Sequence, residues 1–590
     1  MFFLGTICSC SQQQKTPIMQ IKAQFSVDLT VLQNMIRDSL LLVVKKQKDV
    51  SLMKKHFLKC RNQYKKIEYF SEYFYGATSR LVNGAPIAEI ELGENMVTPP
   101  AGFQVIEGLL YGQLNKENYA KLTNEITSIT VPIKRMLMLN RELDNNDAQI
   151  FDALRMEIFR ITALGMSGFD NPASLQALPE TATSLANMAS ILSFYGEVPK
   201  SINDNINQAV VYLNGKTFYN FNQLDFITNY LQPIAVGINN FRNQLKIEAL
   251  TSESPLNIEV TSLFQKNAFN INSFLGNQTL YQSNAKIILG KALFNDAILS
   301  KNGTTNCASC HHSNKAFTDG LQTAPSLTKG KNLTRNTPTL TYAGYQNAFF
   351  YDLKSSSLED QSLAVMQNPD EMHGSITNAV YKINKIKKYH NLIKNAYPKD
   401  STLATAFKIE NALASYVRSL GNFSSRFDKY VQGDKKQLNQ EEKNGFNLFM
   451  GKGKCGSCHF APLFNGTTPP RFLNTEAEVL GVPTKPVLTN AKLDPDLGRF
   501  ALNPYPQYKF AFKTPTLRNI ALTAPYMHNG VYKTLEQVID FYNIGGGIGL
   551  GLDVPSQTLS AEKLNLTSKE KQNLIAFMRT LTDNVSNSKY

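Results

Sequence analysis

Cysteine and histidine are scarce in this chain, which contains seven of each among its 590 residues. Cys8 and Cys10 lie near the N-terminus, and four of the other five cysteines fall in two short motifs, so their spacing does not indicate a disulfide framework. Long apolar runs are also missing, since none reaches the roughly 18 residues that a membrane-spanning helix needs. These absences argue against a disulfide-stabilised scaffold and against a bundle of membrane-spanning helices.

The chain is basic, with a formal net charge of +14, but it has no sustained basic block. Because the lysines are scattered and no nucleic-acid-binding motif is present, we expect no nucleic-acid partner. The surplus charge favours solubility or attraction to an acidic partner. A hydrophobic fraction of 42% with 18% charged residues is typical of a globular protein, and the length allows about three domains.

The N-terminal stretch MFFLGTICSCSQQQK contains a short apolar run that ends at cysteines and is followed by polar residues. This order resembles a bacterial lipoprotein signal, which implies export and a lipid anchor at Cys10 or, as the alternative, at Cys8. The basic residues that normally open such a signal are absent, so a truncated or misassigned start is the other interpretation. We predict a signal segment and linker over residues 1–24, and a periplasmic, lipid-anchored protein of a Gram-negative bacterium.

Residues 25–270 are expected to form a helical domain. The stretches LTVLQNMIRDSLLLVV and KKHFLKCRNQYKKIEYFSEYFYG carry apolar residues three and four apart, which is the pattern of amphipathic helices. Breaks rich in Pro, Gly and Asn separate groups of such helices. The pattern therefore predicts a bundle.

One stretch of this region, GFQVIEGLLYG at residues 102–112, resembles the G-x-H-x-x-E signature of the imelysin family, whose members are paired helical bundles of the bacterial periplasm. The upstream RNQYKKIEYFSEYF is similar to the first helix of that family. Gln104 stands where the family has a metal-ligand histidine, whereas Glu107 remains. Because a neutral amide carbonyl is a poor ligand for a transition metal, the resemblance implies a fold but no metal site.

Two motifs place Cys-x-x-Cys directly before a histidine, at residues 307–311 and 455–459. This spacing matches the two vinyl groups of haem and carries the histidine to the proximal side of the iron. A redox dithiol does not need the histidine, and half of a zinc site needs further ligands. Two such motifs favour two covalently bound haem c groups. The predicted attachment and iron-ligand residues are Cys307, Cys310 and His311 for the first haem, and Cys455, Cys458 and His459 for the second.

An amphipathic helix and a Gly-containing loop precede each motif, so we expect two related modules in tandem. Residues 271–432 would form the first cytochrome c-like domain and residues 433–590 the second. The expected fold class is mainly α, with an N-terminal helical bundle followed by these two haem domains.

From residue 286 to residue 582 the chain resembles the bacterial di-haem cytochrome c peroxidases, to which the MauG enzymes are related. The stretches that carry the resemblance occur in the family's order: LGKALFNDAILSKNGTTNCASCH, RNTPTL, SLEDQSLAVMQNPDEM, DLGRF, FKTPTLRNIALTAPYMHNG and TLEQVIDFYNIGGG. The resemblance implies that the first haem reacts with peroxide and that the second transfers electrons to it.

The resemblance also implies a catalytic pair above the first haem. The family's distal glutamine and glutamate match Gln361 and Glu371. A glutamate over the open face can take a proton from one peroxide oxygen and return it to the leaving oxygen. Taken alone, Glu371 in NPDEM would be interpreted as a helix-capping acid at the surface.

Two departures from the family pattern concern the first haem. Many of these peroxidases carry a resting-state distal histidine a few residues before RNTPT, but here the stretch is SLTKGKNL. The first haem is therefore expected to have an open sixth position without reductive activation. The chain also contains no tryptophan and reads FFYDL where the family has a tryptophan between the haems, so Tyr351 takes that place as a poorer relay.

A third departure concerns the second haem. Ordinary members have a distal methionine ligand at a position that aligns with Tyr542, and tyrosine is what MauG enzymes use. Met527 in APYMHNG is the competing ligand. A thioether raises the haem potential, whereas a phenolate lowers it and favours more highly oxidised iron. We prefer Tyr542 and expect His528 to hydrogen-bond nearby rather than to bind iron.

The resemblance further implies one calcium ion between the modules. Asn336, Thr523 and Pro525 match the positions whose oxygens bind it, two of them through backbone carbonyls, which suits a hard cation. The alternative is that RNTP and TAP are simply turn sequences. Three further histidines, His312, His373 and His390, are expected at the surface.

The function that the resemblance implies is reduction of hydrogen peroxide to water, with electrons from a small cytochrome c or cupredoxin. Two alternatives stay open. One is a MauG-like oxidase that uses peroxide to modify a protein or a small molecule. The other is a non-enzymatic di-haem electron-transfer protein, with the imelysin-like domain as its binding part.

Overall fold

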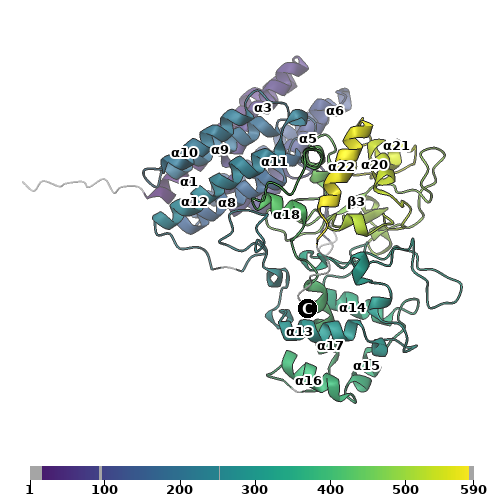
Figure 1. Ribbon diagram of the computed structural model, residues 1–590. Helices are drawn as coiled ribbons and strands as arrows, with labels where there is room; N and C mark the ends of the chain where they lie inside the picture. Colours follow the sequence, from purple (N-terminus) through teal and green to yellow (C-terminus); the bar gives the residue numbers. More distant parts are fainter. Residues whose placement is uncertain (1–15, 92–95, 252, 401, 584–590) are drawn as a thin grey trace, which may run out of the picture. The chain divides into compact units, whose positions relative to one another are not determined.

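The computed structural model describes residues 16–91, 96–251, 253–400 and 402–583, which form two compact units (Figure 1). The helical unit consists of the described residues up to Glu157, with Leu178–Asn214 and Pro233–Leu250. The motif unit consists of Ile158–Ala177, Gly215–Gln232 and the described residues from Thr251 onward. The predicted lipid anchor at Cys10 lies outside the described residues.

The helical unit confirms the helices expected from sequence periodicity. The antiparallel strands β1 (Glu89–Glu91) and β2 (Met96–Thr98) are paired in it, and a π-helical turn at Ile36–Leu40 joins its first two helices. Its helices are α1 (Pro17–Met35), α2 (Leu41–Lys45), α3 (Val50–Phe74), α4 (Gly76–Asn83), α5 (Phe103–Tyr111), α6 (Lys116–Ser128), α7 (Thr130–Glu142), α8 (Asp147–Ala163, which continues into the motif unit), α9 (Ala177–Ser193), α10 (Lys200–Leu213) and α12 (Gln232–Gln244).

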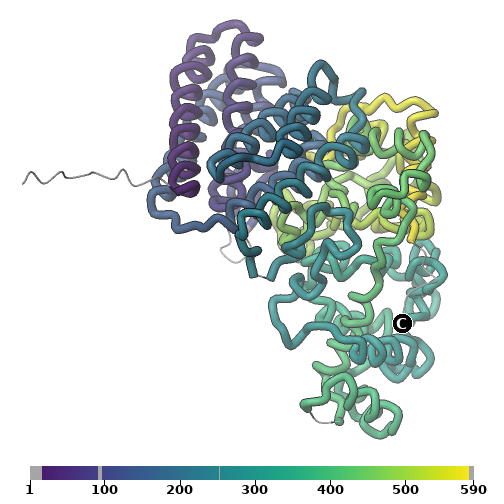
Figure 2. Tube along the Cα trace, turned by 60° about the vertical axis from the view of Figure 1, so that its left-hand side comes forward, coloured from purple at the N-terminus to yellow at the C-terminus, as the bar shows by residue number. Residues whose placement is uncertain are grey.

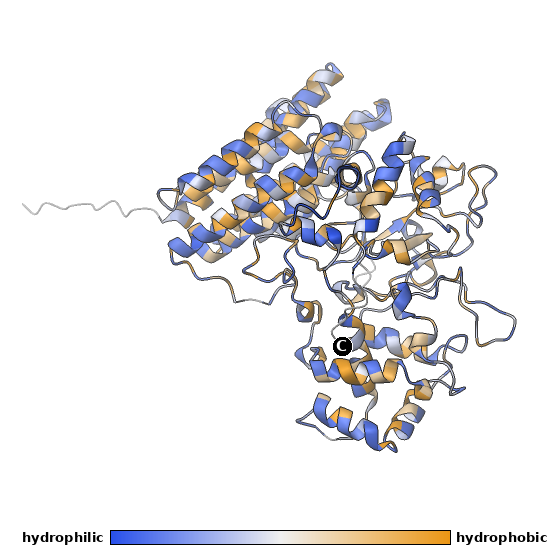
Figure 3. Ribbon diagram, in the orientation of Figure 1, coloured by the Kyte–Doolittle hydropathy of each residue, from blue (hydrophilic) through white to orange (hydrophobic). Residues whose placement is uncertain are grey.

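Local signals explain where the long helices begin. Thr16 caps α1 by accepting a hydrogen bond from the Met19 amide, and Asp49 caps α3 in the same way. Buried side chains of α1 recur four, four and three residues apart, at Ile21, Phe25, Leu29 and Leu32, which is one apolar face of a helix. α1 lies beside α3 (Figure 2). Figure 3 shows hydrophobic and hydrophilic residues on each long helix, as expected for amphipathic helices. No described helix is long and apolar enough to cross a bilayer.

The motif unit is also mainly helical, which confirms the predicted fold class. Among the described residues its only strands are the antiparallel pair β3 (Ala477–Val479) and β4 (Ala511–Lys513). Its helices are α11 (Gln223–Phe226), α13 (Asn284–Phe294), α14 (Leu358–Gln367), α15 (Ile376–Ile383), α16 (Lys387–Ala396), α17 (Ala406–Arg418), α18 (Arg426–Val431), α19 (Gln440–Met450), α20 (Leu535–Asn543), α21 (Gly546–Gly549) and α22 (Ser568–Thr580).

The same helix pairing occurs twice in the motif unit. Before the first motif, α13 packs against α17 (Figure 1), and before the second, α19 packs against α22. Each crossing depends on a glycine. A Cβ at Gly290 would lie 1.9 Å from the Ala412 carbonyl oxygen, and a Cβ at Gly445 would lie 2.0 Å from that of Asn573. Two equivalent crossings support the interpretation of two related modules, although the predicted boundaries at residues 270 and 432 stay predictions.

Charged and polar contacts join the two modules within the motif unit. Fully buried Arg518 holds Asp428 with both guanidinium nitrogens at 2.9 Å. Arg335 contacts Asp496 at 2.6 Å, and the Asn336 amide donates to the His528 carbonyl at 2.7 Å. A bidentate, buried pair such as Arg518–Asp428 is costly to break on one side, so it helps to hold the modules in one arrangement.

Candidate functional site

The first Cys-x-x-Cys-His motif is a short turn with a fixed histidine. Cys307–Ser309 form a 3₁₀ turn that the side chains of Asn306 and Ser309 cap reciprocally. His311 Nδ1 donates to the Phe317 carbonyl oxygen at 2.8 Å, since a carbonyl can only accept. Burial lowers the pKa of His311, which keeps the imidazole neutral. A neutral imidazole with Nδ1 bound to the backbone presents Nε2 as a metal ligand.

The second motif repeats this geometry with different partners. Cys455–Ser457 form a 3₁₀ turn, and His459 Nδ1 lies 3.0 Å from the Pro515 carbonyl oxygen and 3.3 Å from that of Phe464. Burial lowers the pKa of His459 to about 4, so this imidazole is also neutral at physiological pH. Two unrelated loops thus hold the two histidines in the same tautomer.

The donor set of both motifs fits haem c better than the alternatives. All four motif cysteines are free thiols. Burial raises the pKa of Cys307 and of Cys455 to about 12, so these thiols are poor nucleophiles for dithiol exchange. Within the described residues no group of three or more His, Cys, Asp and Glu side chains is arranged to hold a metal ion, so zinc lacks its further ligands.

Glu371 lies beside the first motif in a tightly held loop after α14. Asn368 Nδ2 donates to Glu371 Oε1 at 2.7 Å, and Asn368 Oδ1 accepts from the Asp370 amide at 3.0 Å. Burial raises the pKa of the Glu371 carboxyl, and the hydrogen bond from Asn368 opposes that rise. The pKa of the Cys310 thiol is raised by burial and then by the charges of Asp319 and Glu371, which shows that the carboxylate is near the motif.

The Glu371 loop is fixed from both sides. Ser326 Oγ and Thr328 Oγ1 donate to the Asp370 carboxylate at 2.8 and 3.0 Å, and they belong to the stretch that lacks the family's histidine. A Cβ at Gly374 would lie 2.1 Å from the Leu299 carbonyl oxygen, so the loop closes directly on the segment that leads into the motif. Sequence reasoning identified Glu371 but missed Asn368 and Asp370, because the sequence Asn-Pro-Asp at residues 368–370 indicates only a turn.

Gln361 is half-buried on α14, the helix that leads into this loop, and Ser357 caps that helix. Its side chain makes no hydrogen bond with Glu371 in the part of the chain that the structure describes. The structure thus places the predicted pair on one helix-and-loop element, with only Glu371 held by a described side-chain contact.

Comparisons with known proteins agree with this geometry. A family model described as di-haem cytochrome c peroxidase matches residues 284–436. The methylamine utilization protein MauG of Methylorubrum extorquens is 33% identical over 298 residues, which are 50% of this chain and 78% of that protein. The chain belongs to the di-haem cytochrome c peroxidase family. Membership makes it a peroxidase, an oxidoreductase, and implies two haem c groups, as the two motifs predict.

Other relatives in the family are similarly distant. The cytochrome c551 peroxidase of Nitrosomonas europaea is 32% identical over 296 residues, which are 50% of this chain and 79% of that protein. A solved MauG-like protein associated with microbial copper homeostasis is 31% identical, with a TM-score of 0.45, over 52% of this chain and 92% of that one. These matches cover about half of the chain.

The two candidates for the distal ligand of the second haem lie in different surroundings. Burial raises the pKa of the Tyr542 phenol, and the neighbouring thiols of Cys458 and Cys455, when ionised, raise it further. Tyr542, on α20, is therefore close to the second motif. Met527 has a left-handed backbone with φ of 74°, in a loop whose Asn529 carbonyl accepts from Gln322 of the first module.

Tyr351 lies at the seam between the modules, which is the region where residues of the first module, such as Tyr351, contact residues of the second, such as Lys513. Its hydroxyl donates to Asn336 Oδ1 at 3.4 Å, and its carbonyl accepts from the Lys513 amide of β4 at 2.7 Å. Burial raises the pKa of the Tyr351 phenol, and the hydroxyl's partner is an amide that cannot take its proton. A tyrosine in this environment loses an electron less readily than one that is hydrogen-bonded to a base.

The predicted calcium residues lie near the same seam. The backbone N–H of Asn336 donates a hydrogen bond to the backbone carbonyl of His528, so Asn336 lies next to the segment that follows Pro525. The Asn336 Oδ1 accepts from Tyr351, and the Thr523 hydroxyl donates to the Ile520 carbonyl at 3.2 Å. The chemistry of these oxygens suits calcium, but their described contacts are those of a folded turn as well.

Two histidines outside the motifs, His528 and His390, make side-chain contacts. His528 lies 3.3 Å from Asp494 and is stacked on Phe512 with ring centroids 3.7 Å apart, as expected for a hydrogen-bonding residue. Burial opposes ionisation of Asp494, but hydrogen bonds from His528 and Asn529 outweigh it and lower the pKa of Asp494 to about 2. Elsewhere, His373 is exposed, His312 is half-buried, and His390 bonds to the Asn384 carbonyl at 2.8 Å.

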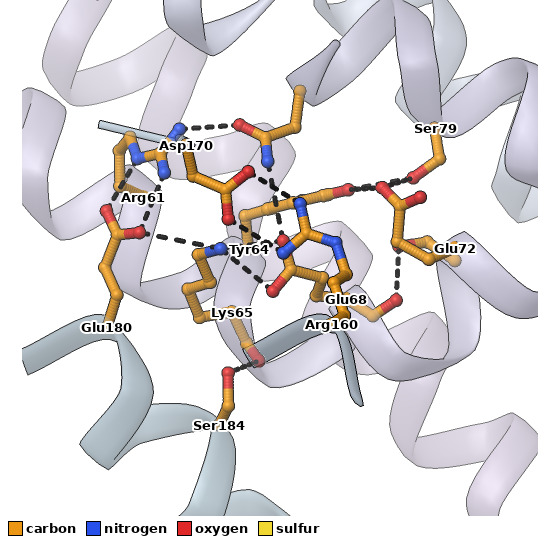
Figure 4. Close-up of polar contacts among 12 residues, drawn as sticks. Arg61, Tyr64, Lys65, Glu68, Glu72, Ser79, Arg160, Asp170, Glu180 and Ser184 are labelled. Atoms are coloured by element: carbon orange, nitrogen blue, oxygen red, sulfur yellow. Dashed lines mark hydrogen bonds and ion pairs between the residues drawn. The ribbon is translucent and has the colours of Figure 1, made fainter. Parts of the chain in front are cut away.

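Figure 4 shows polar contacts of several charged side chains, among them Arg61, Lys65, Glu68 and Glu180 of the helical unit. Arg61 holds Glu180 through two bonds of 2.7 and 2.8 Å, and Lys65 holds Glu68 at 2.7 Å. Gln104, at the imelysin-like position, donates to the Asn83 carbonyl at 3.1 Å. Each of these two cations is paired with a carboxylate inside the bundle, which is the arrangement of a structural network.

Proposed function

We propose that the protein reduces hydrogen peroxide to water at the haem of the first motif, with electrons that arrive through the haem of the second. The observation that carries this proposal is Glu371, a carboxylate beside the first motif with a raised pKa and a fixed orientation. The haem residues would be Cys307, Cys310, His311, Cys455, Cys458 and His459. The electron donor would be a small cytochrome c or a cupredoxin.

When bound, the first haem supplies the redox-active iron at which the O–O bond is reduced, and the chain supplies the proton transfer. Glu371 takes the proton from one peroxide oxygen and returns it to the other, which leaves as water. Two electrons and two further protons complete the formation of two water molecules. Asn368 holds the carboxylate in place, and Gln361 would orient the peroxide from α14.

We further propose that the first haem accepts peroxide without prior reduction of the second. Residues 326–333 contain no histidine that could occupy the sixth position. Ser326 and Thr328 are instead committed to Asp370, next to Glu371. Residues 326–333 therefore support the loop that carries Glu371, and they supply no side chain that would occupy the sixth position of the iron.

One observation favours a second candidate, a MauG-like oxidation of a protein or a small molecule that consumes peroxide. Tyr542 is near Cys455 and Cys458, which supports it over Met527 as the distal ligand of the second haem. A phenolate ligand lowers the haem potential, which makes electron entry from a small carrier less favourable.

Several finer assignments complete the proposal. Asn336, Thr523 and Pro525 would hold one calcium ion between the modules, and Tyr351 would lie between the haems. The imelysin-like domain would span residues 25–270, followed by haem domains over residues 271–432 and 433–590. We place the protein in the periplasm, anchored by a lipid at Cys10.

The decisive experiment is an absorption spectrum of the purified, fully oxidised protein before and after addition of hydrogen peroxide. We expect a high-spin haem whose spectrum changes on addition, and steady-state oxidation of a reduced small cytochrome. Two low-spin haems that do not react would overturn the proposed site. A spectral reaction without cytochrome turnover would favour the second candidate over the first.

A further inference from the structure

Lys513 is an unusual cation in the seam between the modules. It ends β4, and its Nζ donates to Gln346 Oε1 at 2.6 Å. Buried arginines elsewhere in the motif unit each hold a carboxylate, as Arg418 holds Glu359 and Arg518 holds Asp428. Within the described residues Lys513 makes no ion pair. An ammonium has three N–H donors, so two of them lack a protein acceptor here.

The carboxylate that acts on Lys513 electrostatically already has another partner. Asp352 attracts Lys513 electrostatically, but Asp352 Oδ2 accepts from Arg335 at 2.6 Å. Burial lowers the pKa of Lys513 to about 8, which reflects the cost of a charge that is removed from water. Lys513 is half-buried, and a partly desolvated ammonium with one neutral partner gains stability when an anion from outside the chain approaches it.

The contacts of Lys513 and of the residues that follow it indicate which anion this would be. Its backbone amide donates to the carbonyl of Tyr351, from the first module. Two residues farther along, the Pro515 carbonyl accepts from the proposed iron ligand His459. We propose that Lys513 is the counter-ion of a haem propionate carboxylate at this seam, with Gln346 holding the ammonium in position. This inference rests on the proposed haem attachment, and either of the two haems can supply the carboxylate.

The test replaces Lys513 by methionine and measures the midpoint potential of each haem by spectroelectrochemical titration. Loss of a cation beside a propionate favours oxidised iron. We expect the reduced-to-oxidised ratio of one haem, at a fixed applied potential, to fall about tenfold, which is a decrease of about 59 mV for a one-electron couple. A shift of the low-spin haem would assign the propionate to the second motif, and a shift of the high-spin haem to the first.

The matched control is Lys533→Met, which removes the same charge from an exposed position in the same unit and should leave both potentials unchanged. Unchanged potentials in Lys513→Met, with two haems still bound, would overturn the inference. A haem content below two in the wild-type protein would instead refute the haem assignment itself. If Lys513→Met does not fold, Lys513→Arg keeps the charge, and its altered reach should shift a propionate bending band in the resonance Raman spectrum. Unchanged bands in that variant would also reject the proposal.

Discussion

Glu371 is the residue on whose carboxylate the proposed peroxide chemistry depends most directly. Glu371→Gln keeps the shape and the hydrogen bond with Asn368 but removes the base. General acid–base assistance is typically worth about 10²–10⁴-fold, so peroxide turnover should slow on that order. Both haem spectra should stay nearly unchanged, in contrast to His311→Ala, which should disturb the first haem. Full peroxidase activity in Glu371→Gln would show that another group moves the proton.

Asn368 tunes the pH at which that base operates. Glu371 acts as a base only when it is deprotonated, so activity is lost as pH falls through its pKa. Burial raises this pKa and the Asn368 hydrogen bond lowers it, so Asn368→Ala should raise it further and move the acid limb of kcat/KM to higher pH. The pH–rate profile measures this shift. Exposed Asn395→Ala is the control, and an unmoved limb in Asn368→Ala would contradict the role of this hydrogen bond.

Tyr542 and Met527 can be separated by substitution at each position. Since Tyr542 is the residue beside the second motif, Tyr542→Phe should alter the absorption and magnetic resonance spectra of the low-spin haem and raise its potential. Met527→Leu should leave those spectra as in the wild type. The opposite pattern would assign the ligand to Met527 and would favour the peroxidase over the MauG-like candidate.

At the scale of elements, sequence reasoning was strongest where the signal is local. Helices α1 and α3 could be predicted from the spacing of their apolar residues, and each Cys-x-x-Cys-His turn from five contiguous residues. The partners that hold the histidines did not follow, because Phe317 and Pro515 contribute backbone carbonyls that have no side-chain signature. Lys513 and Asn368 were missed for a related reason: their roles depend on packing between segments that are distant or turn-like, rather than on periodicity.

The two helix crossings give a prediction at this scale. A Cβ at Gly445 would overlap the Asn573 carbonyl of α22, and backbone cannot move aside without separating the helices. Gly445→Ala should therefore lower the free energy of unfolding by about 1–3 kcal/mol and weaken haem retention in the second module. Thermal unfolding followed at the haem absorption measures this. Gly276→Ala, where a Cβ meets nothing within 4 Å, is the control that should behave as the wild type. Equal melting of the two variants would refute the crossing argument.

For the whole molecule, the two modules share one compact unit, yet each holds its motif histidine through its own loops. His311 depends on Phe317, and His459 on Phe464 and Pro515, so loss of one haem should not release the other.

We expect the double substitution Cys455→Ala, Cys458→Ala to lower the haem content from two per chain to one, as measured by the pyridine haemochrome assay against protein concentration. The remaining high-spin haem should still react with added peroxide, because Glu371 and its supporting loop are untouched. Steady-state oxidation of a reduced small cytochrome should be lost, because electrons would no longer enter through the second haem. Cys60→Ala, in the helical unit and outside both motifs, should keep both haems and full turnover. Turnover that survives the double substitution would mean that the first haem takes electrons directly, and the proposed relay through the second module would then be wrong.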